Sequence, residues 1–326
     1  MPKTRILSGM RPTGKLHLGH LFGAIANWVE LQRDYECFYM VADWHALTTA
    51  FMDTEDVKEN IRQVCMDYIA GGLDPEKCTF YVQSHVPEIA ELYQLMAPLV
   101  PVSWLERTPS YKDQIEQLGQ ELANFGFLGY PVLMTCDIIA FKAEVVPVGQ
   151  DQLPHLELCR EIVRRFHHYY GQVFPEPHAK LTQFPNVPGI DGRKMSKSYN
   201  NSILISDDSA AIKKKVKMMI TDPQKIYKGD PGNPEVCTVY YFQNIYNPDK
   251  VSEIHKGCTS GELGCVADKN SLAEAMIKGL APVQEKRKVY EENPQLIDDI
   301  LARGCEKARK AAMETLKDAK RAMKML

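Results

Sequence analysis

Several features are missing from this sequence, and each absence excludes a class of protein. No apolar run reaches about eighteen residues, so no membrane span is expected. The start, MPKTRILSGM, lacks the long apolar core of a signal peptide. Positive charge is not in excess, because the formal net charge is −3, so any contact with RNA requires a local basic patch. We find no internal repeat and no low-complexity tract.

The cysteines form no disulfide framework. Their number, nine, is odd, and their spacing matches no small disulfide scaffold. We therefore expect free thiols in a reducing, cytoplasmic compartment. The chain has 326 residues, of which 44% are hydrophobic and 25% are charged. This composition is typical of a globular protein with a sizeable core and about two domains.

Strand and helix patterns alternate along the first part of the chain. Buried-type strands are expected at 4–9, 37–47, 79–86 and 144–152. Helical spacing begins at Leu21 and recurs at 55–71, 88–98, 111–124 and 152–169. This alternation predicts an α/β fold, in which a Rossmann-like, doubly wound parallel sheet carries helices on both faces.

From Asp207 onward the pattern is mostly helical. Helical segments are expected at 208–220, 270–293 and 294–326. We therefore predict a Rossmann-like domain over 1–190, a mobile loop or hinge over 191–201 and an α-helical C-terminal domain over 202–326. The last helix is expected to pack back on the first domain.

The first loop contains a near-match to a phosphate-binding P-loop. Gly9, Gly14 and Lys15 fit the pattern. Leu16 stands where a Ser or Thr should bind magnesium, so we reject the P-loop interpretation.

The stretch HLGH follows directly. His17 and His20 flank Gly19 at the start of a helix that leaves a strand. A helix N-terminus attracts anions, Gly19 allows a nucleotide close to the backbone, and both imidazoles can donate to phosphate. On this stretch alone, an ordinary pair of loop histidines is the simpler interpretation.

A second motif, KMSKS, occupies 194–198. Lys194 and Lys197 lie three residues apart on a polar loop preceded by glycine. Such a loop can close over a triphosphate and bring two cations to the leaving pyrophosphate. Taken alone, a solvated basic linker explains it as well. The combination of H-x-G-H with K-M-S-K-S about 175 residues later is far more specific than either motif.

Together the two motifs resemble the signatures of class I aminoacyl-tRNA synthetases. The stretches GMRPTGKLHLGHLFGAIANW, VADWHALT, YPVLMTCDII, VPVGQDQLPHLELCREIVRRF and GRKMSKS are similar to those of bacterial-type tryptophanyl-tRNA synthetases, over nearly the whole chain. The resemblance implies a cytoplasmic homodimer that activates L-tryptophan with ATP and Mg²⁺ and transfers it to tRNA(Trp). Tyrosyl-tRNA synthetases share the fold but not this combination of stretches.

The resemblance assigns roles to individual residues. The catalytic residues that it implies are His17, His20, Lys194 and Lys197. The implied ATP-binding residues are Arg11, Thr13, Gly19, His20, Gly149, Asp151, Gln152, Lys194, Met195, Ser196 and Lys197. The implied tryptophan-binding residues are His45, Met134, Asp137, Val146, Val148 and Gln152. Many relatives carry Gln at the position of Arg11.

The chemistry of the tryptophan site can be compared with these residues. Indole N–H is only a donor, so the pocket needs a buried acceptor. Asp137 lies in an apolar segment, where an unpaired carboxylate is costly, and the resemblance places it on the indole nitrogen. Met134, one helical turn earlier, would pack on the ring. His45 is explained equally well as a satisfied core histidine, and Asp137 would also suit the hydroxyl of tyrosine.

The stretch VPVGQDQ ends an expected strand, where ligands of open α/β sheets usually bind. Gly149 allows ribose or adenine to lie against the backbone, and Asp151 and Gln152 offer polar contacts to the nucleotide and the substrate amine. Asp151 would equally suit the N-cap of the next helix, and the two roles are compatible.

A group of cysteines lies in the predicted helical domain. Cys237, Cys258 and Cys265 match three of the four cysteines that hold a [4Fe–4S] cluster in one branch of the family, and Asp268 takes the fourth position. Oxygen is a poor ligand for such iron. The alternatives are completion by Asp268 or by the distant Cys305, a three-iron cluster, a structural zinc, or free thiols packed as small hydrophobic groups.

Contacts with tRNA are expected in the helical domain. Positive charge lies at 212–217 and in 303–324, where eight Lys/Arg stand against three Asp/Glu. A solvated helix face explains this charge as well as phosphate contacts do. Two other functions are compatible with parts of the pattern. Another adenylyl-transferring enzyme would generally lack the helical domain, and a non-catalytic RNA-binding relative would usually lack the histidine pair or the lysines.

Overall fold

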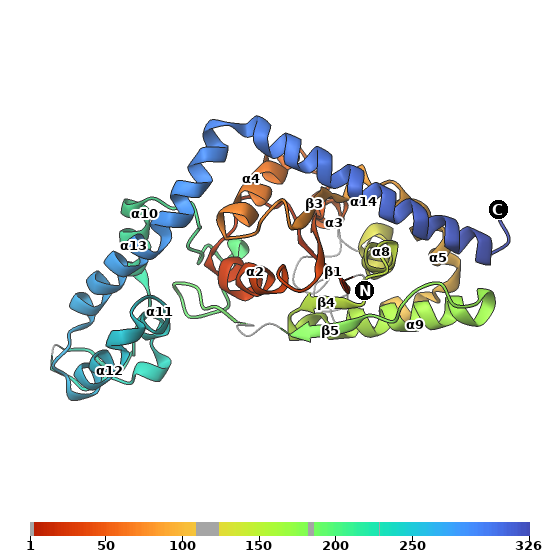
Figure 1. The fold of residues 1–326 in the computed structure, drawn as a ribbon. Helices are drawn as coiled ribbons and strands as arrows, with labels where there is room; N and C mark the ends of the chain where they lie inside the picture. Colours follow the sequence, from red (N-terminus) through yellow and green to blue (C-terminus); the bar gives the residue numbers. More distant parts are fainter. Residues whose placement is uncertain (1–2, 109–123, 182–185, 228) are drawn as a thin grey trace. The chain divides into compact units, whose positions relative to one another are not determined.

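Figure 1 shows the fold of the computed structural model, which describes residues 3–108, 124–181, 186–227 and 229–326. The chain divides into two compact units. The sheet unit comprises 1–14, 27–185 and 290–326, and the helical unit comprises 15–26 and 186–289. The helix expected at 111–124 lies largely outside the described residues.

The sheet unit is built on five parallel strands in the order β3-β2-β1-β4-β5. The strands are β1 (Arg5–Met10), β2 (Glu36–Val41), β3 (Cys78–Val82), β4 (Val145–Val148) and β5 (His178–Leu181). All five residues of β3 are buried, as are five of the six in β2. Such continuous burial is typical of a parallel sheet covered by helices, and the predicted α/β class is confirmed.

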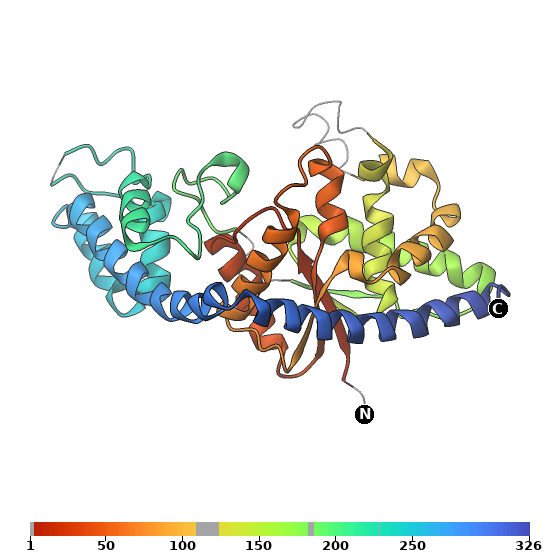
Figure 2. The same cartoon turned by 90° about the horizontal axis from the view of Figure 1, so that it is seen from above.

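Helices alternate with these strands and lie around the sheet (Figures 1 and 2). They are α2 (Ala26–Leu31), α3 (Asp43–Ala50), α4 (Val57–Ala70), α5 (Glu88–Met96), α6 (Val102–Glu106), α8 (Phe125–Ala140) and α9 (Leu153–Tyr170). The long central helix α8 begins at Asn124, whose side chain accepts a hydrogen bond from the N–H of Phe127 at 2.9 Å. This cap fixes the start of the helix that carries Asp137.

The last helix, α14 (Pro294–Ala322), belongs to the sheet unit and packs on β3, α4, α5 and α8 (Figures 1 and 2). Because β3 is an edge strand, its outer N–H groups need partners. Cys305 Sγ accepts a hydrogen bond from the N–H of Val82 at 3.3 Å. The closest approach is at Gly304, where a Cβ atom would lie 1.7 Å from the carbonyl oxygen of Phe80.

The strand expected at 37–47 is shorter than predicted, because it ends at Val41 and α3 begins at Asp43. One carboxylate oxygen of Asp43 accepts hydrogen bonds from the N–H groups of Trp44 and Ser84, at 3.0 and 2.9 Å. Such local side-chain bonds favour a turn or helix start over a continued strand. The prediction was therefore wrong beyond the first half of this segment.

The helical unit contains α10 (Ser209–Met218), α11 (Thr238–Tyr246), α12 (Val251–Ser260) and most of α13 (Cys265–Glu292). Tyr246 packs edge-on against Phe22, with ring centroids 5.9 Å apart, and a Cβ on Gly279 would lie 2.8 Å from the Tyr246 ring. The segment 15–26 is thus part of the core of this unit. None of the helices in the described residues has the length and apolar composition needed to cross a membrane.

Candidate active site

The predicted site residues of the sheet unit lie where its strands end. Arg11 follows β1, His45 lies one turn beyond β2, and Gln152 follows β4. The strand order 3-2-1-4-5 places β1 and β4 side by side. The chain adds β2 and β3 beyond β1 on one side, and β5 beyond β4 on the other. Ligands of open α/β sheets bind at such a point, beyond the carboxyl ends of the strands.

Asp137 is the polar centre of this region. Its side chain, on α8, is 1% exposed, and its Oδ2 lies 2.8 Å from Nε2 of His45. Gln83 Nε2 donates to both carboxylate oxygens, at 2.8 and 3.0 Å. Burial raises the pKa of Asp137, while the hydrogen bond and charge of His45 and the bond from Gln83 oppose the rise. The arrangement is that of a buried acceptor held by donors.

Three other predicted tryptophan-binding residues lie on α8 and β4. Met134 lies one turn before Asp137 on α8 and is half-buried. Val146 and Val148 are buried on β4, at 3% and 9% exposure. Met134, Val146 and Val148 supply apolar surface next to the sheet edge at which the polar residues stand.

Two residues of this region were missed by the sequence analysis. Gln83 ends the apolar segment TFYV, and a polar residue at a strand end was the available signal. Tyr130 Oη lies 2.6 Å from Nε2 of buried His155, and its ring centroid lies 6.5 Å from that of His45. Burial lowers the pKa of His155, so its imidazole is neutral near pH 7.

Gly149 follows β4 and precedes a short 3-10 turn (Gln150–Gln152), which contains Asp151 and Gln152. A Cβ on Gly149 would lie 2.6 Å from Oδ1 of Asp151, so a larger residue would require the Asp151 side chain to turn away. Gln152 Nε2 donates to Asp151 Oδ2 at 2.9 Å. The N-cap of α9 is Gln152 and no side chain caps the helix, so Asp151 does not play the capping role considered above.

Arg11 and Thr13 lie on the loop after β1, and both are exposed. Arg11 Nη1 is 3.4 Å from Thr49 Oγ1, and the N–H of Thr13 donates to the carbonyl of Arg11 at 2.9 Å. The guanidinium group therefore points along α3 at the carboxyl edge of the sheet.

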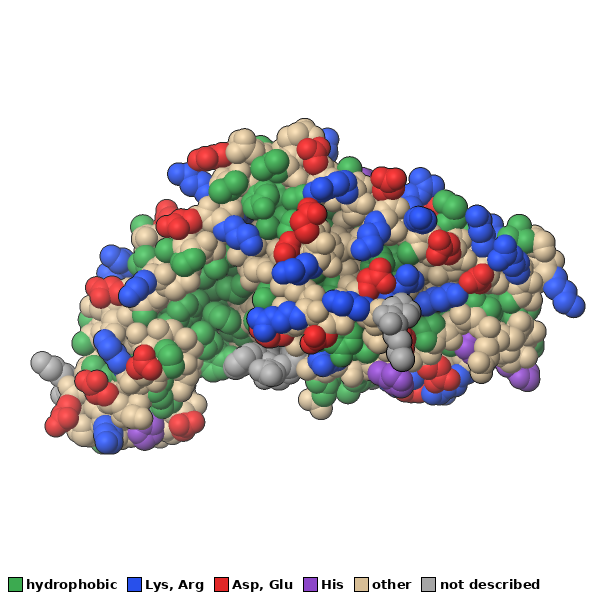
Figure 3. All heavy atoms as spheres, viewed as in Figure 1, with side chains coloured by type: hydrophobic (Ala, Val, Ile, Leu, Met, Phe, Trp, Pro, Cys, Tyr) green, Lys and Arg blue, Asp and Glu red, His purple; other side chains and the backbone are tan. Residues whose placement is uncertain are grey.

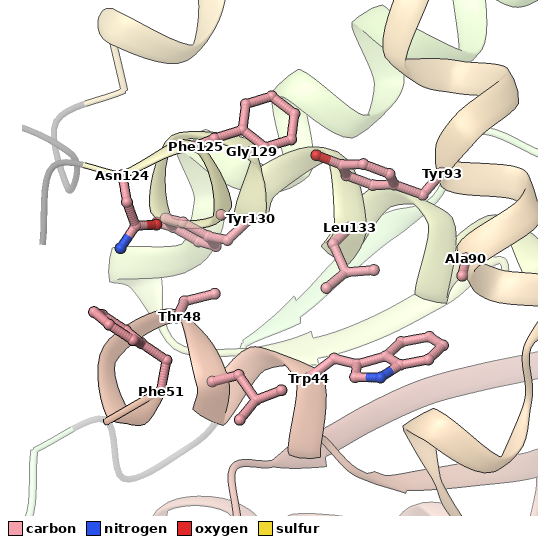
Figure 4. A pocket seen from close by; sticks show the side chains of 12 residues that line it. Trp44, Thr48, Phe51, Ala90, Tyr93, Asn124, Phe125, Gly129, Tyr130 and Leu133 are labelled. Carbon is pink, nitrogen blue, oxygen red and sulfur yellow. The ribbon is translucent and has the colours of Figure 1, made fainter. Parts of the chain in front are cut away.

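An apolar cavity of about 560 Å³ lies between α3, α5 and α8 (Figure 4). Trp44 of α3 and Phe51, which follows that helix, face Tyr130 and Leu133 of α8 across it, and Tyr93 of α5 closes one side. None of the predicted site residues lines this cavity. It is therefore distinct from the polar centre at Asp137, although Tyr130 contributes to both regions.

The H-x-G-H stretch belongs to the helical unit. The chain at His17 pairs in antiparallel fashion with Leu204, and the N–H of Leu18 donates to the carbonyl of Ile203 at 2.9 Å. A short helix, α1 (Leu18–His20), then continues through a π-helical turn (Leu21–Ile25) into α2. Single π-turns inside helices are frequent at functional sites.

The two histidines lie in contact and are neutral. Their ring centroids are 3.8 Å apart, and the N–H of His17 donates to Nδ1 of His20 at 3.2 Å. Burial, and then the charge of Lys197, lowers the pKa of His17 to about 4. Burial, followed by His17 and Lys197, lowers the pKa of His20 well below its usual value. Because Nδ1 of His20 accepts a bond, its Nε2 carries the hydrogen and can donate to an anion.

The KMSKS loop is folded around one buried asparagine. Asn201, 1% exposed, donates to Asp191 Oδ1 at 2.7 Å and accepts from the N–H of Ser196 at 2.8 Å. Lys194 is exposed, whereas Lys197 is half-buried. Met195 is buried, and a Cβ on Gly19 would lie 3.5 Å from its Cβ.

The helical unit thus contains all four predicted catalytic residues. The structure brings the H-x-G-H and KMSKS stretches together within this unit, through the contact of Gly19 with Met195 and the electrostatic effect of Lys197 on both histidines. The carboxylate centre at Asp137 belongs to the sheet unit.

The cysteine group does not fit a four-thiolate cluster. Cys237, Cys258 and Cys265 are partly exposed, and burial raises the pKa of the Cys237 and Cys258 thiols. Asp268 is 8% exposed, and its carboxylate accepts a hydrogen bond from Gln243 Nε2 at 2.7 Å. Within the described residues, which include these positions, no group of three or more His, Cys, Asp or Glu is arranged to hold a metal ion.

Comparison with known proteins agrees with this geometry. A family model described as "tRNA synthetases class I (W and Y)" matches residues 1–281. A tryptophan–tRNA ligase of Thermotoga maritima is 47% identical over 99% of both chains, and one of Aquifex aeolicus is 42% identical over 98% of this chain and 100% of the relative. The crystal structure of tryptophanyl-tRNA synthetase from Campylobacter jejuni, complexed with ADP and tryptophan, is 33% identical with a TM-score of 0.89, covering 98% of this chain and 99% of that one. The chain therefore belongs to the class I tRNA synthetases of the tryptophan and tyrosine family, and within that family to the tryptophan–tRNA ligases.

Proposed function

We infer that this chain is a tryptophan–tRNA ligase, which activates L-tryptophan with ATP and transfers it to the 3′ end of tRNA(Trp). The observation that carries this inference is full-length similarity to proteins named for that activity, together with a buried acceptor at Asp137. An acceptor alone would also suit tyrosine. The choice of tryptophan follows from the relatives, which are named for tryptophan at 42% and 47% identity.

The first reaction is attack of the tryptophan carboxylate on the α-phosphate of magnesium-bound ATP. A bond forms between a carboxylate oxygen and the α-phosphorus, the bond to the β-phosphate oxygen breaks, and pyrophosphate leaves with magnesium. The nucleophile is already ionised, so no general base is needed. Catalysis then depends on alignment and on stabilising the charge that spreads over the phosphate oxygens.

The lysines and the histidines of the helical unit have different roles in this catalysis. Lys194 and Lys197 hold the departing pyrophosphate, and His17 and His20 donate to the α-phosphate region. Neutral imidazoles suit this role because they donate hydrogen bonds without adding charge to a buried position. Support comes from the lowered pKa of each histidine and from the nearness of Lys197.

The other binding roles follow the same assignment. Asp137 accepts the indole N–H, with His45, Met134, Val146 and Val148 around the ring. Gln152 contacts the substrate amine. The nucleotide is bound by Arg11, Thr13, Gly19, His20, Gly149, Asp151, Gln152, Lys194, Met195, Ser196 and Lys197.

In the second reaction the tryptophanyl group passes from the adenylate to a hydroxyl of the terminal ribose of tRNA, and AMP leaves. We assign ATP and tryptophan binding to 1–190, loop movement to 191–201 and anticodon binding to the helical segment from 202. The packing of α14 on the sheet unit favours ending the anticodon-binding region near 289.

The basic residues of α14 are less available to RNA than their number suggests. Lys and Arg side chains gather along this helix (Figure 3). Many of them pair with carboxylates of the sheet unit: Arg303 with Glu76, Lys307 with Glu36, Arg309 with Glu88 and Lys320 with Glu91. By contrast, Lys213, Lys214 and Lys217 of α10 are exposed, and we assign phosphate contacts to them.

We further propose that the protein works as a homodimer, as the family resemblance implies. The apolar cavity between α3, α5 and α8 supports this, because its rim exposes 48% of Phe51 and 74% of Phe125. Apolar surface of this kind is typical of contact sites. Light scattering of the purified protein would give the mass of two chains; the mass of one chain would contradict the proposal.

For the cysteine group we propose free thiols and no cluster. An iron–sulfur cluster would need four thiolates, whereas the fourth position is a carboxylate held by Gln243. Cys305 is no substitute, because its sulfur accepts the hydrogen bond from Val82 in the sheet unit.

The test of the function is amino-acid-dependent ATP–pyrophosphate exchange, measured separately with tryptophan and tyrosine. Exchange with tryptophan, followed by tryptophan transfer to tRNA, is the expected result. Exchange with tyrosine alone, or with neither amino acid, would overturn the assignment.

A further inference from the structure

We propose that Gln83 is a positioning residue, which orients Asp137 and thereby makes the enzyme prefer a substrate ring that carries an N–H donor. The proposal rests on the proposed role of Asp137 as acceptor for the indole. It adds a residue at the end of β3 to a site otherwise assigned to the loops after β1, β2 and β4 and to α8.

The orientation of the Gln83 amide follows from its two neighbours. Its Oε1 accepts a hydrogen bond from the backbone N–H of His45 at 3.3 Å. That N–H is only a donor, so the oxygen must face His45 and the NH₂ group must face Asp137. The two Nε2 distances, 2.8 and 3.0 Å, then describe one NH₂ group that spans both oxygens of the carboxylate.

This contact fixes the plane of the Asp137 carboxylate. Gln83 is fully buried and Asp137 is 1% exposed, so water does not compete for the hydrogen bonds. The backbone of Gln83 is itself held, because the N–H of the next residue, Ser84, donates to Asp43 at 2.9 Å. The carboxylate of Asp43 thus links the turn after β3 with the start of α3, which carries His45.

The contacts also determine what kind of group can still bind to Asp137. A carboxylate has about four lone-pair positions. Gln83 uses one on each oxygen, and His45 uses a second on Oδ2. The remaining lone-pair position, on Oδ1, can only accept a hydrogen bond. It therefore suits an indole N–H and forms no hydrogen bond with a ring that lacks a donor.

The chain therefore achieves selectivity through a residue that need not touch the substrate. Without Gln83, the carboxylate would keep only the contact with His45 and could rotate about its Cβ–Cγ bond. The remaining lone pair of Oδ1 would then no longer point in a fixed direction. A substrate ring without an N–H donor would therefore lose less binding free energy relative to indole. Tryptophan would lose its binding advantage over an analogue with an isosteric ring, while packing of the ring would be unaffected.

The experiment compares tryptophan with benzothienylalanine, in which sulfur replaces the indole N–H. We expect the wild type to prefer tryptophan in kcat/KM for ATP–pyrophosphate exchange. Gln83→Met, which keeps the length of the side chain, should raise KM for tryptophan roughly tenfold to hundredfold, the effect of one lost hydrogen bond to a charged group. It should leave KM for the analogue and for ATP within about twofold, so the preference falls by about the same factor.

Two further variants keep the test decisive. Gln83→Glu retains the acceptor for the N–H of His45 but places a carboxylate against Asp137, and the preference should fall as well, even if Gln83→Met does not fold. Thr79→Val is the matched control, because Thr79 is buried on β3, the strand that leads to Gln83, and its hydroxyl has no partner among the described residues. The control should keep the wild-type preference.

The outcomes separate this inference from the proposed function. An equal loss for tryptophan and the analogue, or an unchanged preference, in a folded Gln83 variant would overturn the positioning role. A wild type without preference for tryptophan over the analogue would instead refute the acceptor role of Asp137 itself, and the present inference with it.

Discussion

Burial determines the protonation of the two histidines in the H-x-G-H stretch, and this has a measurable effect on stability. The pKa of His17 is about 4 in the folded chain, against 6.5 in an unfolded one. Between these values the unfolded chain binds more protons, so stability falls as the pH falls. At about pH 5 the loss from His17 alone is roughly 2 kcal/mol.

The corresponding measurement is urea unfolding at about pH 7.5 and about pH 5. We expect His17→Gln to lose about 2 kcal/mol less than the wild type on acidification, because it lacks this group. His178→Gln, which changes an exposed histidine of β5, should follow the wild type. Equal losses in His17→Gln and the wild type would contradict a buried, neutral His17.

The charge of Lys197 acts on both histidines, and we expect its loss to slow the first reaction. We expect Lys197→Ala to slow tryptophan-dependent ATP–pyrophosphate exchange about 10²–10³-fold, as for other donors to a developing charge. Tryptophan binding, measured by calorimetry, should be nearly unchanged. Lys213→Ala, which removes an exposed cation from the same unit, should keep the wild-type rate. An unchanged rate in Lys197→Ala would refute its role at the pyrophosphate.

Single residues of the site were predictable to different degrees. Asp137 could be identified because an isolated carboxylate in an apolar segment needs a partner. Gln83 and Tyr130 could not, because their importance depends on which strand ends and helix faces meet. Those contacts are set by tertiary packing. Gln83 stands in none of the stretches that carry the resemblance, and Tyr130 opens YPVLMTCDII but has no local pattern that assigns it a role.

At the scale of elements, the contact of α14 with β3 gives a sharp prediction. Helix propensity alone would make Gly304→Ala stabilising by about 1 kcal/mol. The new Cβ would, however, lie 1.7 Å from the carbonyl oxygen of Phe80, which is backbone and cannot move aside cheaply. Overpacking of this kind costs about 1–3 kcal/mol. We therefore expect net destabilisation, seen as a lower midpoint in urea.

Ala302→Gly is the matched control, because Ala302 is exposed on the same helix. It should cost about 1 kcal/mol through propensity alone. If Gly304→Ala were instead more stable than the wild type, the close packing of helix and strand would be wrong.

The helices and strands themselves were predicted unevenly. Helices with one apolar side, such as α4 and α9, were found with nearly correct ends. The helix α8 was not identified as an element, because it is apolar on all sides and contains Pro131. The helix α12 is absent from the predicted segments, and α13 begins at Cys265, ahead of the segment expected from 270.

At the scale of the whole molecule, the order of the chain and the order of the fold differ. Residues 15–26 belong to the helical unit although the sheet unit surrounds them in sequence, and 290–326 return to the sheet unit. The alternation of strands and helices, followed by a mostly helical pattern, indicated two domains in succession. The return of the last helix was expected, but the placement of 15–26 was not, because the pairing of 16–18 with 203–205 is a long-range contact without a local signal.

The metal content of the whole protein follows from the cysteine group. We expect anaerobically purified protein to contain far less than one iron or zinc per chain, and a chelator to leave the thermal midpoint unchanged. Asp268→Cys, which supplies a fourth thiol, is the control for whether the preparation can load iron. Stoichiometric iron and sulfide in the wild type would contradict the free-thiol proposal.

The position of α14 also bears on how the protein is made. The strands of the sheet leave the ribosome well before 294–322, yet the edge strand β3 packs against that helix. Contacts between such distant parts of a chain slow folding, and an uncovered edge strand invites pairing with other chains. The growing chain thus carries an aggregation-prone edge through most of its synthesis, and this interval is when a chaperone would be needed.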